Sequence, residues 1–183
     1  MRNSTHQRPL VIAGVIIVVL VALAAGGYAV LLQHRKSLPP LLQPLVGGRS
    51  IHILGQAMAP TLRDNQVVAA DTGAYRNHAP QRGDIVLFTP PGENPGLVVK
   101  RIIAIPGDRL LITNGAVSVN GQVISEPYLP ERWTFNNSWP ADGQEQTVPR
   151  NEYFVMGDNR NHSSDSRVYG YVNLDAIQGK LLP

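Results

Sequence analysis

The sequence predicts a mainly β domain of antiparallel strands, preceded by one N-terminal transmembrane helix. Residues 9–32 contain no charged side chain, and a helix of that length crosses the hydrocarbon core of a bilayer, which is about 30 Å thick. From residue 51 onward, short apolar runs alternate with Gly, Pro, Asn and Asp, as is typical of small antiparallel sheets. With 183 residues, the chain holds one such anchor and one domain of roughly 140 residues.

Charge and composition exclude several classes of protein. The net charge is +3 and the pI is about 9.4, but the Lys and Arg residues are scattered along the chain, which argues against nucleic-acid binding. The absence of cysteine excludes disulfides, thiolate catalysis and cysteine zinc sites. We therefore expect no cofactor, no metal ion and no nucleic-acid partner.

The N-terminal part predicts a short segment, residues 1–8, followed by the anchor, residues 9–32. A cleaved secretory signal is the alternative, because Ala22-Leu23-Ala24 fits a small-x-small cleavage site. The apolar run continues past this site to Leu32, which is longer than the apolar region of a signal peptide and favours an uncleaved anchor. Two basic residues on each side of the run balance one another, so charge counting does not settle its orientation.

Residues 33–50 predict a Pro-rich juxtamembrane connector. Pro39, Pro40 and Pro44 each fix φ and remove a backbone donor, so the segment is expected to be extended and to hold the following domain close to the bilayer.

The domain, residues 51–183, contains six apolar runs that predict strands. They are residues 66–70, 84–88, 97–105, 109–113, 116–119 and 152–156. Turn residues separate them, and Asn114-Gly115 is the clearest signal, because Asn-Gly between two apolar runs is typical of a type I′ hairpin.

Lys100 carries most of the chemical argument. Alternation along the strand places Lys100 on one face with Val98 and Ile102, whereas Arg101 lies on the other face. An ammonium among apolar neighbours loses hydration, which lowers its pKa and makes the neutral amine available as a general base. The commoner alternative for a lone lysine is a side chain that reaches water from an edge strand.

Three segments resemble the type I signal peptidases: Gly55-Gln56-Ala57-Met58-Ala59-Pro60-Thr61-Leu62, Val99-Lys100-Arg101, and residues 157–167, which read GDNRNHSSDSR. Arg82-Gly83-Asp84 and Pro106-Gly107-Asp108 match two further family boxes, so the resemblance covers residues 51–182. It implies a barrel-like antiparallel β domain on the outer side of the plasma membrane, a cytoplasmic N-terminus, and removal of signal peptides from secretory precursors after small residues, Ala-x-Ala.

The resemblance also implies the residues of a Ser-Lys dyad. Ala57 stands at the position of the nucleophilic serine, Lys100 matches the general base, and Ser163 matches the serine that orients the lysine. Three residues match the pockets for small substrate side chains or, alternatively, belong to the core: Met58, Leu62 and Val99. Four charged residues match a structural framework near the site: Arg101, Asp158, Asp165 and Arg167.

Alanine at position 57 is the one departure from the family pattern. A methyl group cannot form an acyl-enzyme, and loss of the serine costs subtilisin on the order of a millionfold in turnover. Ser50 lies well upstream of the Met-x-Pro turn and Thr61 lies beyond it, so neither is expected to replace the nucleophile. We therefore expect a chain that binds and does not cleave. An engineered substitution and a natural pseudoenzyme both fit this pattern.

Two alternatives remain beside the peptidase. One is a non-catalytic, membrane-tethered protein that binds signal sequences or exported partners. The other is a self-cleaving repressor, which resembles the family in its Ser-Lys site but requires a DNA-binding module where this chain has an apolar run.

Four aromatic residues predict either a membrane-surface patch or a small satellite core: Tyr128, Trp133, Phe135 and Trp139.

Overall fold

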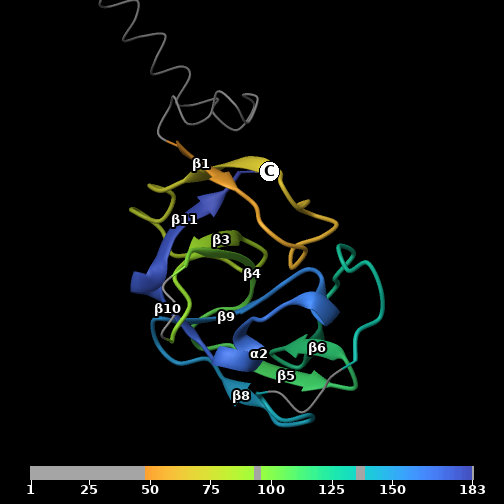
Figure 1. The fold of residues 1–183 in the computed structure, drawn as a ribbon. Helices are drawn as coiled ribbons and strands as arrows, with labels where there is room; N and C mark the ends of the chain where they lie inside the picture. Colours follow the sequence, from red (N-terminus) through yellow and green to blue (C-terminus); the bar gives the residue numbers. More distant parts are fainter. Residues whose placement is uncertain (1–47, 93–95, 135–138, 183) are drawn as a thin grey trace, which may run out of the picture.

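The computed structural model describes residues 48–92, 96–134 and 139–182, and it confirms a mainly β domain with curled antiparallel sheets (Figure 1). The strands are β1 (Gly48–His52), β2 (Val67–Asp71), β3 (Ile85–Phe88), β4 (Val98–Ala104), β5 (Arg109–Thr113), β6 (Ala116–Val119), β7 (Gln122–Val123), β8 (Gln146–Thr147), β9 (Glu152–Met156), β10 (Val172–Asn173) and β11 (Ile177–Leu181). The short helices are η3 (Arg160–His162), α2 (Ser166–Tyr169) and η4 (Leu174–Ala176).

The strands form two antiparallel sheets. The larger sheet has the order β1-β2-β11-β3-β4-β9-β10, and the smaller has the order β7-β6-β5-β8. The C-terminal strand β11 therefore lies between β2 and β3, two strands from much earlier in the chain. Figure 1 shows β1 and β11 at one end of the domain and β5, β6 and β8 at the other.

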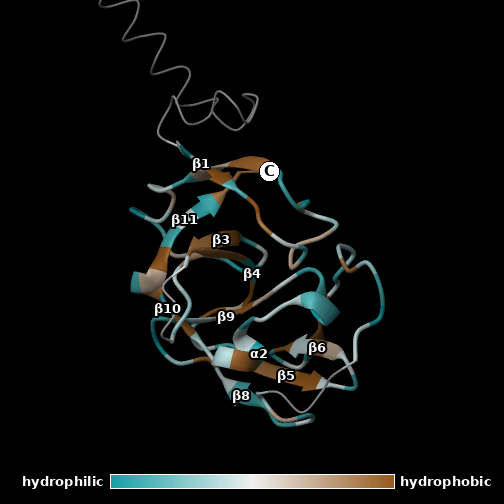
Figure 2. Cartoon of the chain, viewed as in Figure 1, coloured by the Kyte–Doolittle hydropathy of each residue, from teal (hydrophilic) through white to brown (hydrophobic). Residues whose placement is uncertain are grey.

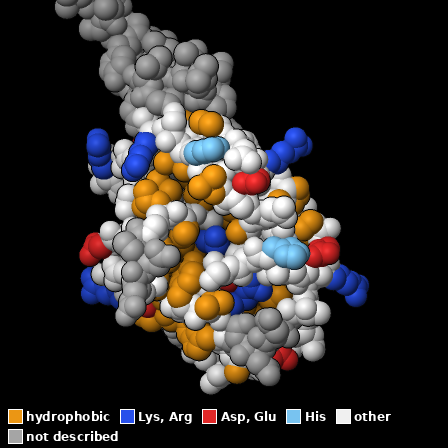
Figure 3. Space-filling model, in the orientation of Figure 1, with side chains coloured by type: hydrophobic (Ala, Val, Ile, Leu, Met, Phe, Trp, Pro, Cys, Tyr) orange, Lys and Arg blue, Asp and Glu red, His pale blue; other side chains and the backbone are white. Residues whose placement is uncertain are grey.

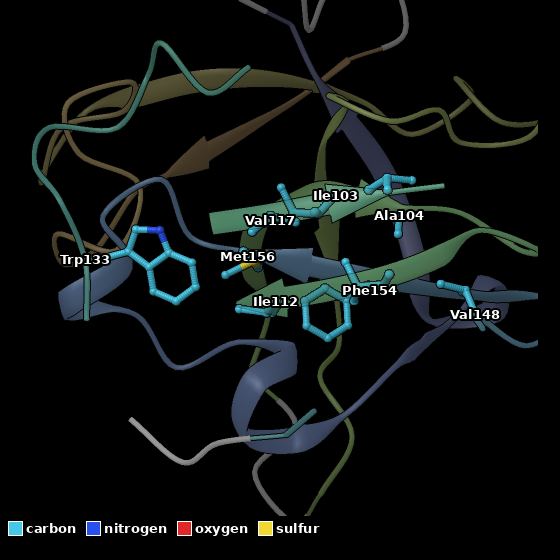
Figure 4. Close-up of a cluster of buried hydrophobic side chains, with 10 residues drawn as sticks. Ile103, Ala104, Ile112, Val117, Trp133, Val148, Phe154 and Met156 are labelled. Atoms are coloured by element: carbon cyan, nitrogen blue, oxygen red, sulfur yellow. The ribbon is translucent and has the colours of Figure 1, made fainter. Parts of the chain in front are cut away.

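Hydrophobic side chains from both sheets form a shared core. Phe154 and Met156 of β9 belong to one buried cluster with Ile112 of β5 and Val117 of β6. Figure 4 shows these side chains between the strands, with Trp133 at one end of the cluster and Val148 at the other. Figure 2 shows hydrophobic residues concentrated on strands such as β3 and β5 and hydrophilic residues on the connecting loops. This core fixes β4 and β9, which flank the candidate site.

The six predicted apolar runs are confirmed as β2, β3, β4, β5, β6 and β9, with boundaries that differ by at most one residue. The predicted Asn-Gly hairpin is also confirmed, because Asn114 and Gly115 both have positive φ, at 50° and 76°. A second pair, Asn120 and Gly121, has the same geometry and joins β6 to β7.

The N-terminal predictions fall largely outside the structure. The short segment 1–8, the anchor 9–32 and residues 33–47 of the connector lie outside the described residues. Within the described ranges, no helix is long and apolar enough to span a membrane. Strand β1 begins at Gly48, so the last three residues of the predicted connector are part of the sheet, where they pair with β2.

The aromatic residues favour the satellite-core interpretation over the membrane-surface one. Trp133 is only 6% exposed and belongs to the shared core. Trp139 is half-buried, and its ring meets the edge of the Tyr171 ring at a centroid distance of 4.7 Å. Tyr128 is half-buried beneath the Arg101 guanidinium, 4.1 Å from its ring centroid. The fourth residue, Phe135, lies outside the described residues.

Candidate active site

A cleft of about 310 Å³ lies between the β1 segment and the start of β4. Ala57 and Lys100, which are 43 positions apart in the sequence, both line it. Residues 49–55 form one wall, and residues 97–99 contribute to the other. Figure 3 shows hydrophobic side chains gathered around a hollow on one face of the molecule, with a basic side chain inside the hollow.

Lys100 is buried rather than extended into water, so the edge-strand alternative is wrong. Its strand pairs with β3 on one side and β9 on the other, and the residue is only 5% exposed. Its neighbours Val98 and Ile102 pack in the cluster beneath β3 and β9, as the alternation predicted. Burial disfavours the charged form and lowers the pKa of Lys100, while the negative charge of Asp165 opposes this effect. Nζ donates a hydrogen bond to Val99 O at 3.1 Å.

The buried carboxylates near Lys100 are already paired with arginines. Asp165 accepts hydrogen bonds from Arg167 Nε and Nη2 at 2.8 and 2.9 Å, and another from Gly157 N at 2.9 Å. Asp158 accepts from Arg101 Nε and Nη2 at 2.8 and 2.7 Å. Both pairs are bidentate, the geometry in which an arginine holds a carboxylate most firmly. In the part of the chain that the structure describes, Lys100 has no ion-pair partner.

Ala57 begins the turn that connects β1 to β2. Its carbonyl oxygen accepts a hydrogen bond from Asn159 N at 3.0 Å, which ties this turn to the loop after β9. Thr61, at the end of the turn, donates from its hydroxyl to Asp158 at 2.5 Å. The carboxylate of Asp158 thus links the Ala57 turn, the loop after β9 and Arg101 of β4.

Gly157 permits a close approach between the Ala57 turn and Ser163. A Cβ atom on Gly157 would lie 2.2 Å from Ser163 Oγ and 2.5 Å from Ala57 O, distances that real side chains do not tolerate. Ser163 Oγ is buried and has no hydrogen-bond partner among the described residues. The structure thus brings Ser163 close to the Ala57 turn, whereas its hydroxyl does not bond to Lys100 in this conformation.

The three predicted pocket residues separate into two groups. Met58 and Val99 line the cleft together with Ala57 and Lys100. Leu62 packs in the same apolar cluster as Met58 but lines a second cleft, of about 500 Å³, on the side where Arg101 lies.

Two features of the site are hard to predict from the sequence. Arg49, Ser50 and His52 line the cleft because β1 pairs with β2, but β1 has no apolar alternation that predicts a strand. Arg160 forms a buried ion pair with Glu126, and its guanidinium lies 5.2 Å from the Trp133 ring centroid. These contacts anchor residues 126–133 against the loop after β9.

The two additional sequence boxes meet in space. Arg82 donates to the Asp108 carboxylate from Nε at 2.6 Å and from Nη2. Asp84 accepts from Tyr75 at 3.0 Å and forms an ion pair with Lys180 of β11. These interactions connect loops to strands and lie outside the residues that line the cleft.

Comparison with known proteins gives consistent results. The family model described as "Signal peptidase, peptidase S26" matches residues 45–182. Signal peptidase I of Leptolyngbya laminosa is 36% identical over 138 residues, which is 70% of this chain and 64% of that protein. Signal peptidase IB of Staphylococcus aureus strain COL is 34% identical over 141 residues, which is 70% of this chain and 73% of that protein.

A crystal structure of a signal peptidase I from Enterococcus faecalis V583 is 35% identical, with a TM-score of 0.48, and the match covers 57% of this chain and 97% of that one.

Proposed function

The chain belongs to the signal peptidase family S26, a family of serine peptidases, and from this premise we propose that its cleft receives the signal peptides of secretory precursors. The observation that carries the proposal is the cleft that Ala57 and Lys100 share, because it combines the turn after β1 with strand β4 at the two positions that match the family's dyad. We further propose that residues 9–32 anchor the chain in the plasma membrane, with the N-terminus in the cytoplasm and the domain on the outer side.

Lys100 has the properties of a general base in this proposal. Its burial favours the neutral amine, whose lone pair takes the proton of a hydroxyl at position 57 as that oxygen attacks the scissile carbonyl. Ser163 is the residue that orients Lys100 in this proposal, since its buried hydroxyl has no hydrogen-bond partner among the described residues and is free to bond to the amine. Arg101, Asp158, Asp165 and Arg167 hold the two site loops in place and are assigned no part in proton transfer.

The substrate proposed is an extended peptide with small residues at the first and third positions before the scissile bond. Backbone groups of β1 have no strand partner on their outer edge within the described residues, and this edge borders the cleft. Strand addition along such an edge gives affinity through backbone hydrogen bonds. Met58 and Val99 line the cleft together with Ala57, and in this proposal their side chains limit the space for substrate side chains, so that alanine is favoured over bulky residues.

Alanine at position 57 makes the present chain a binder rather than a peptidase. Without a hydroxyl there is no acyl-enzyme, so a bound precursor remains uncleaved. The alternative function, a pseudoenzyme that holds signal sequences or exported partners, uses the same cleft and differs only in whether the chain's role is to release a product.

The test is to introduce the missing hydroxyl. Ala57→Ser is expected to create endopeptidase activity on a precursor peptide that contains Ala-x-Ala, and Lys100→Met in that background is expected to remove it. The detergent-solubilised unmodified chain is expected to bind the same peptide saturably and to release no product. Cleavage by the unmodified chain, or activity of Ala57→Ser that survives Lys100→Met, would refute the proposed dyad.

A further inference from the structure

The three lysines of the chain, Lys36, Lys100 and Lys180, are not equivalent. Lys180 forms an ion pair with Asp84, which holds its side-chain nitrogen. Lys100 is buried with no ion-pair partner in the described part of the chain, because Asp165 and Asp158 are held by arginines. Lys36 lies outside the described residues.

The position of Lys100 also makes it accessible to a small ligand. It lines a cleft of about 310 Å³ whose remaining lining is largely aliphatic. The charged and titratable groups around it are Asp165 with its partner Arg167 on one side, and Arg49 and His52 of β1 across the cleft. Arg49 does not favour a charged ammonium close to it, and the Asp165 carboxylate, which does, already forms a bidentate ion pair with Arg167.

The methyl group of Ala57 changes what this amine can do. A serine at position 57 offers the amine a proton to accept, whereas the alanine side chain has no exchangeable proton and no oxygen. A desolvated neutral amine that has no proton to accept retains a free lone pair, and such an amine attacks electrophilic carbonyl carbons.

We propose that Lys100 is a carbonyl-capturing residue that forms an imine with aldehydes entering the cleft. The Nζ lone pair adds to the aldehyde carbon, both protons of the neutral amine move to the carbonyl oxygen, and that oxygen leaves as water as the C=N bond forms, so that amine and aldehyde give imine and water without oxidation or reduction. The ligand class is a small aliphatic aldehyde, or an extended peptide that ends in one. The capture of a small aliphatic aldehyde does not depend on the proposed peptide binding. Only the capture of a peptidyl aldehyde rests on that proposed function.

The test uses the detergent-solubilised full chain at pH 7 with propanal and sodium cyanoborohydride, which reduces any imine to a stable secondary amine. Peptide mapping by mass spectrometry then gives the extent of labelling at each lysine. We expect several-fold more label on Lys100 than on Lys180, because the Lys100 amine is desolvated and has no ion-pair partner among the described residues, whereas the Lys180 nitrogen is held by the Asp84 carboxylate. Equal labelling of the two lysines, or less on Lys100, would overturn the proposal.

Two different substitutions of Lys100 test the assignment, so that the test does not depend on the folding of a single variant. Lys100→Met and Lys100→Arg are both expected to lose the major label while the labelling of Lys180 stays unchanged, and the Arg variant keeps a long cationic side chain. A major label that persists on another residue in either variant contradicts the assignment.

A peptidyl aldehyde that ends in Ala-x-Ala, used in parallel, separates this inference from the proposed function. Labelling of Lys100 by both aldehydes supports the inference and the peptide cleft together. Labelling by propanal alone supports the reactive amine and counts against peptide binding. Labelling by neither aldehyde overturns the inference, while saturable binding of an unreactive peptide of the same sequence still supports the proposed function.

Discussion

Replacing Gly157 with alanine is the sharpest test of how the site is assembled. The added Cβ would lie 2.2 Å from Ser163 Oγ, 2.5 Å from Ser163 Cβ and 2.5 Å from Ala57 O. Ser163 Oγ can rotate away, but Ala57 O is backbone and is held by Asn159 N at 3.0 Å. The clash must therefore displace the Ala57 turn, the loop after β9, or both.

The expected cost follows from overpacking a buried position. Inserting a methyl group into a well-packed interior costs about 1 to 3 kcal/mol. For a domain of this size, each kcal/mol lowers the melting temperature by about 3 to 5 °C, so a decrease of roughly 3 to 15 °C is expected. Displacement of the Ala57 turn also changes the cleft wall, so affinity for an Ala-x-Ala peptide should fall at temperatures where the protein remains folded.

Gly96→Ala is the matched control. Gly96 precedes β4 near the same cleft, its φ is not positive, and a Cβ atom there would meet no atom within 4 Å. Its stability is expected to stay the same or rise by less than about 1 kcal/mol. Thermal unfolding and peptide titration of the two variants in detergent measure the difference. A Gly157→Ala variant with the melting temperature and peptide affinity of Gly96→Ala would refute the close packing described for the site.

Further outcomes test other parts of the structure. In the Ala57→Ser background, peptide cleavage should fall as the pH drops through the lowered pKa of Lys100, because the neutral amine is the base; a flat pH profile contradicts this. Arg101→Met should cost about 3 to 5 kcal/mol of unfolding free energy by leaving Asp158 buried and unpaired. Arg109→Met, which breaks an exposed pair with Glu145, should cost less than about 1 kcal/mol, and equal losses by chemical denaturation would contradict the burial argument. Trp133→Ala should lower the unfolding free energy by about 3 to 5 kcal/mol, because it removes a large side chain from the hydrophobic core. Unchanged stability would instead support a membrane-surface role for this residue. External proteolysis of spheroplasts should remove the domain and leave the anchor in the membrane; a protected domain would contradict the proposed orientation.

Much of the sheet was predictable because its inner strands carry dense apolar runs. Strands β4 and β9 are buried on both faces, and their Val, Ile and Phe residues indicate strands without knowledge of their partners. The Asn114-Gly115 turn was predictable for a local reason, since both residues tolerate positive φ. The apolar neighbours Val98 and Ile102 left the burial of Lys100 open against a side chain that reaches water, and only the resemblance of the flanking motifs favoured a buried base.

The strands that the sequence left unassigned pair through the backbone and carry mixed side chains. β1 contains Arg49, Ser50 and His52 and shows no strand period, whereas β11 alternates apolar and polar residues over only five positions, one of them Gly179. Their positions depend on partners far away in the chain, which a local pattern does not encode. For the same reason, the residues of the β1 wall of the cleft were not predicted.

Strand β11 has a consequence for the order in which the domain is completed. Residues 177–181 follow the other ten strands that the structure describes in chain order, yet they fill the gap between β2 and β3 and complete the larger sheet. Pairings such as β3 with β4 are short-range and can form early, whereas β1 and β2 join β3 only through this final strand. Until residues 177–181 are in place, the sheet does not connect the two walls of the cleft, and their relative position rests on loop contacts such as that of Thr61 with Asp158. A chain that lacks residues 177–181 would therefore lose the continuous sheet that fixes Lys100 relative to Ala57.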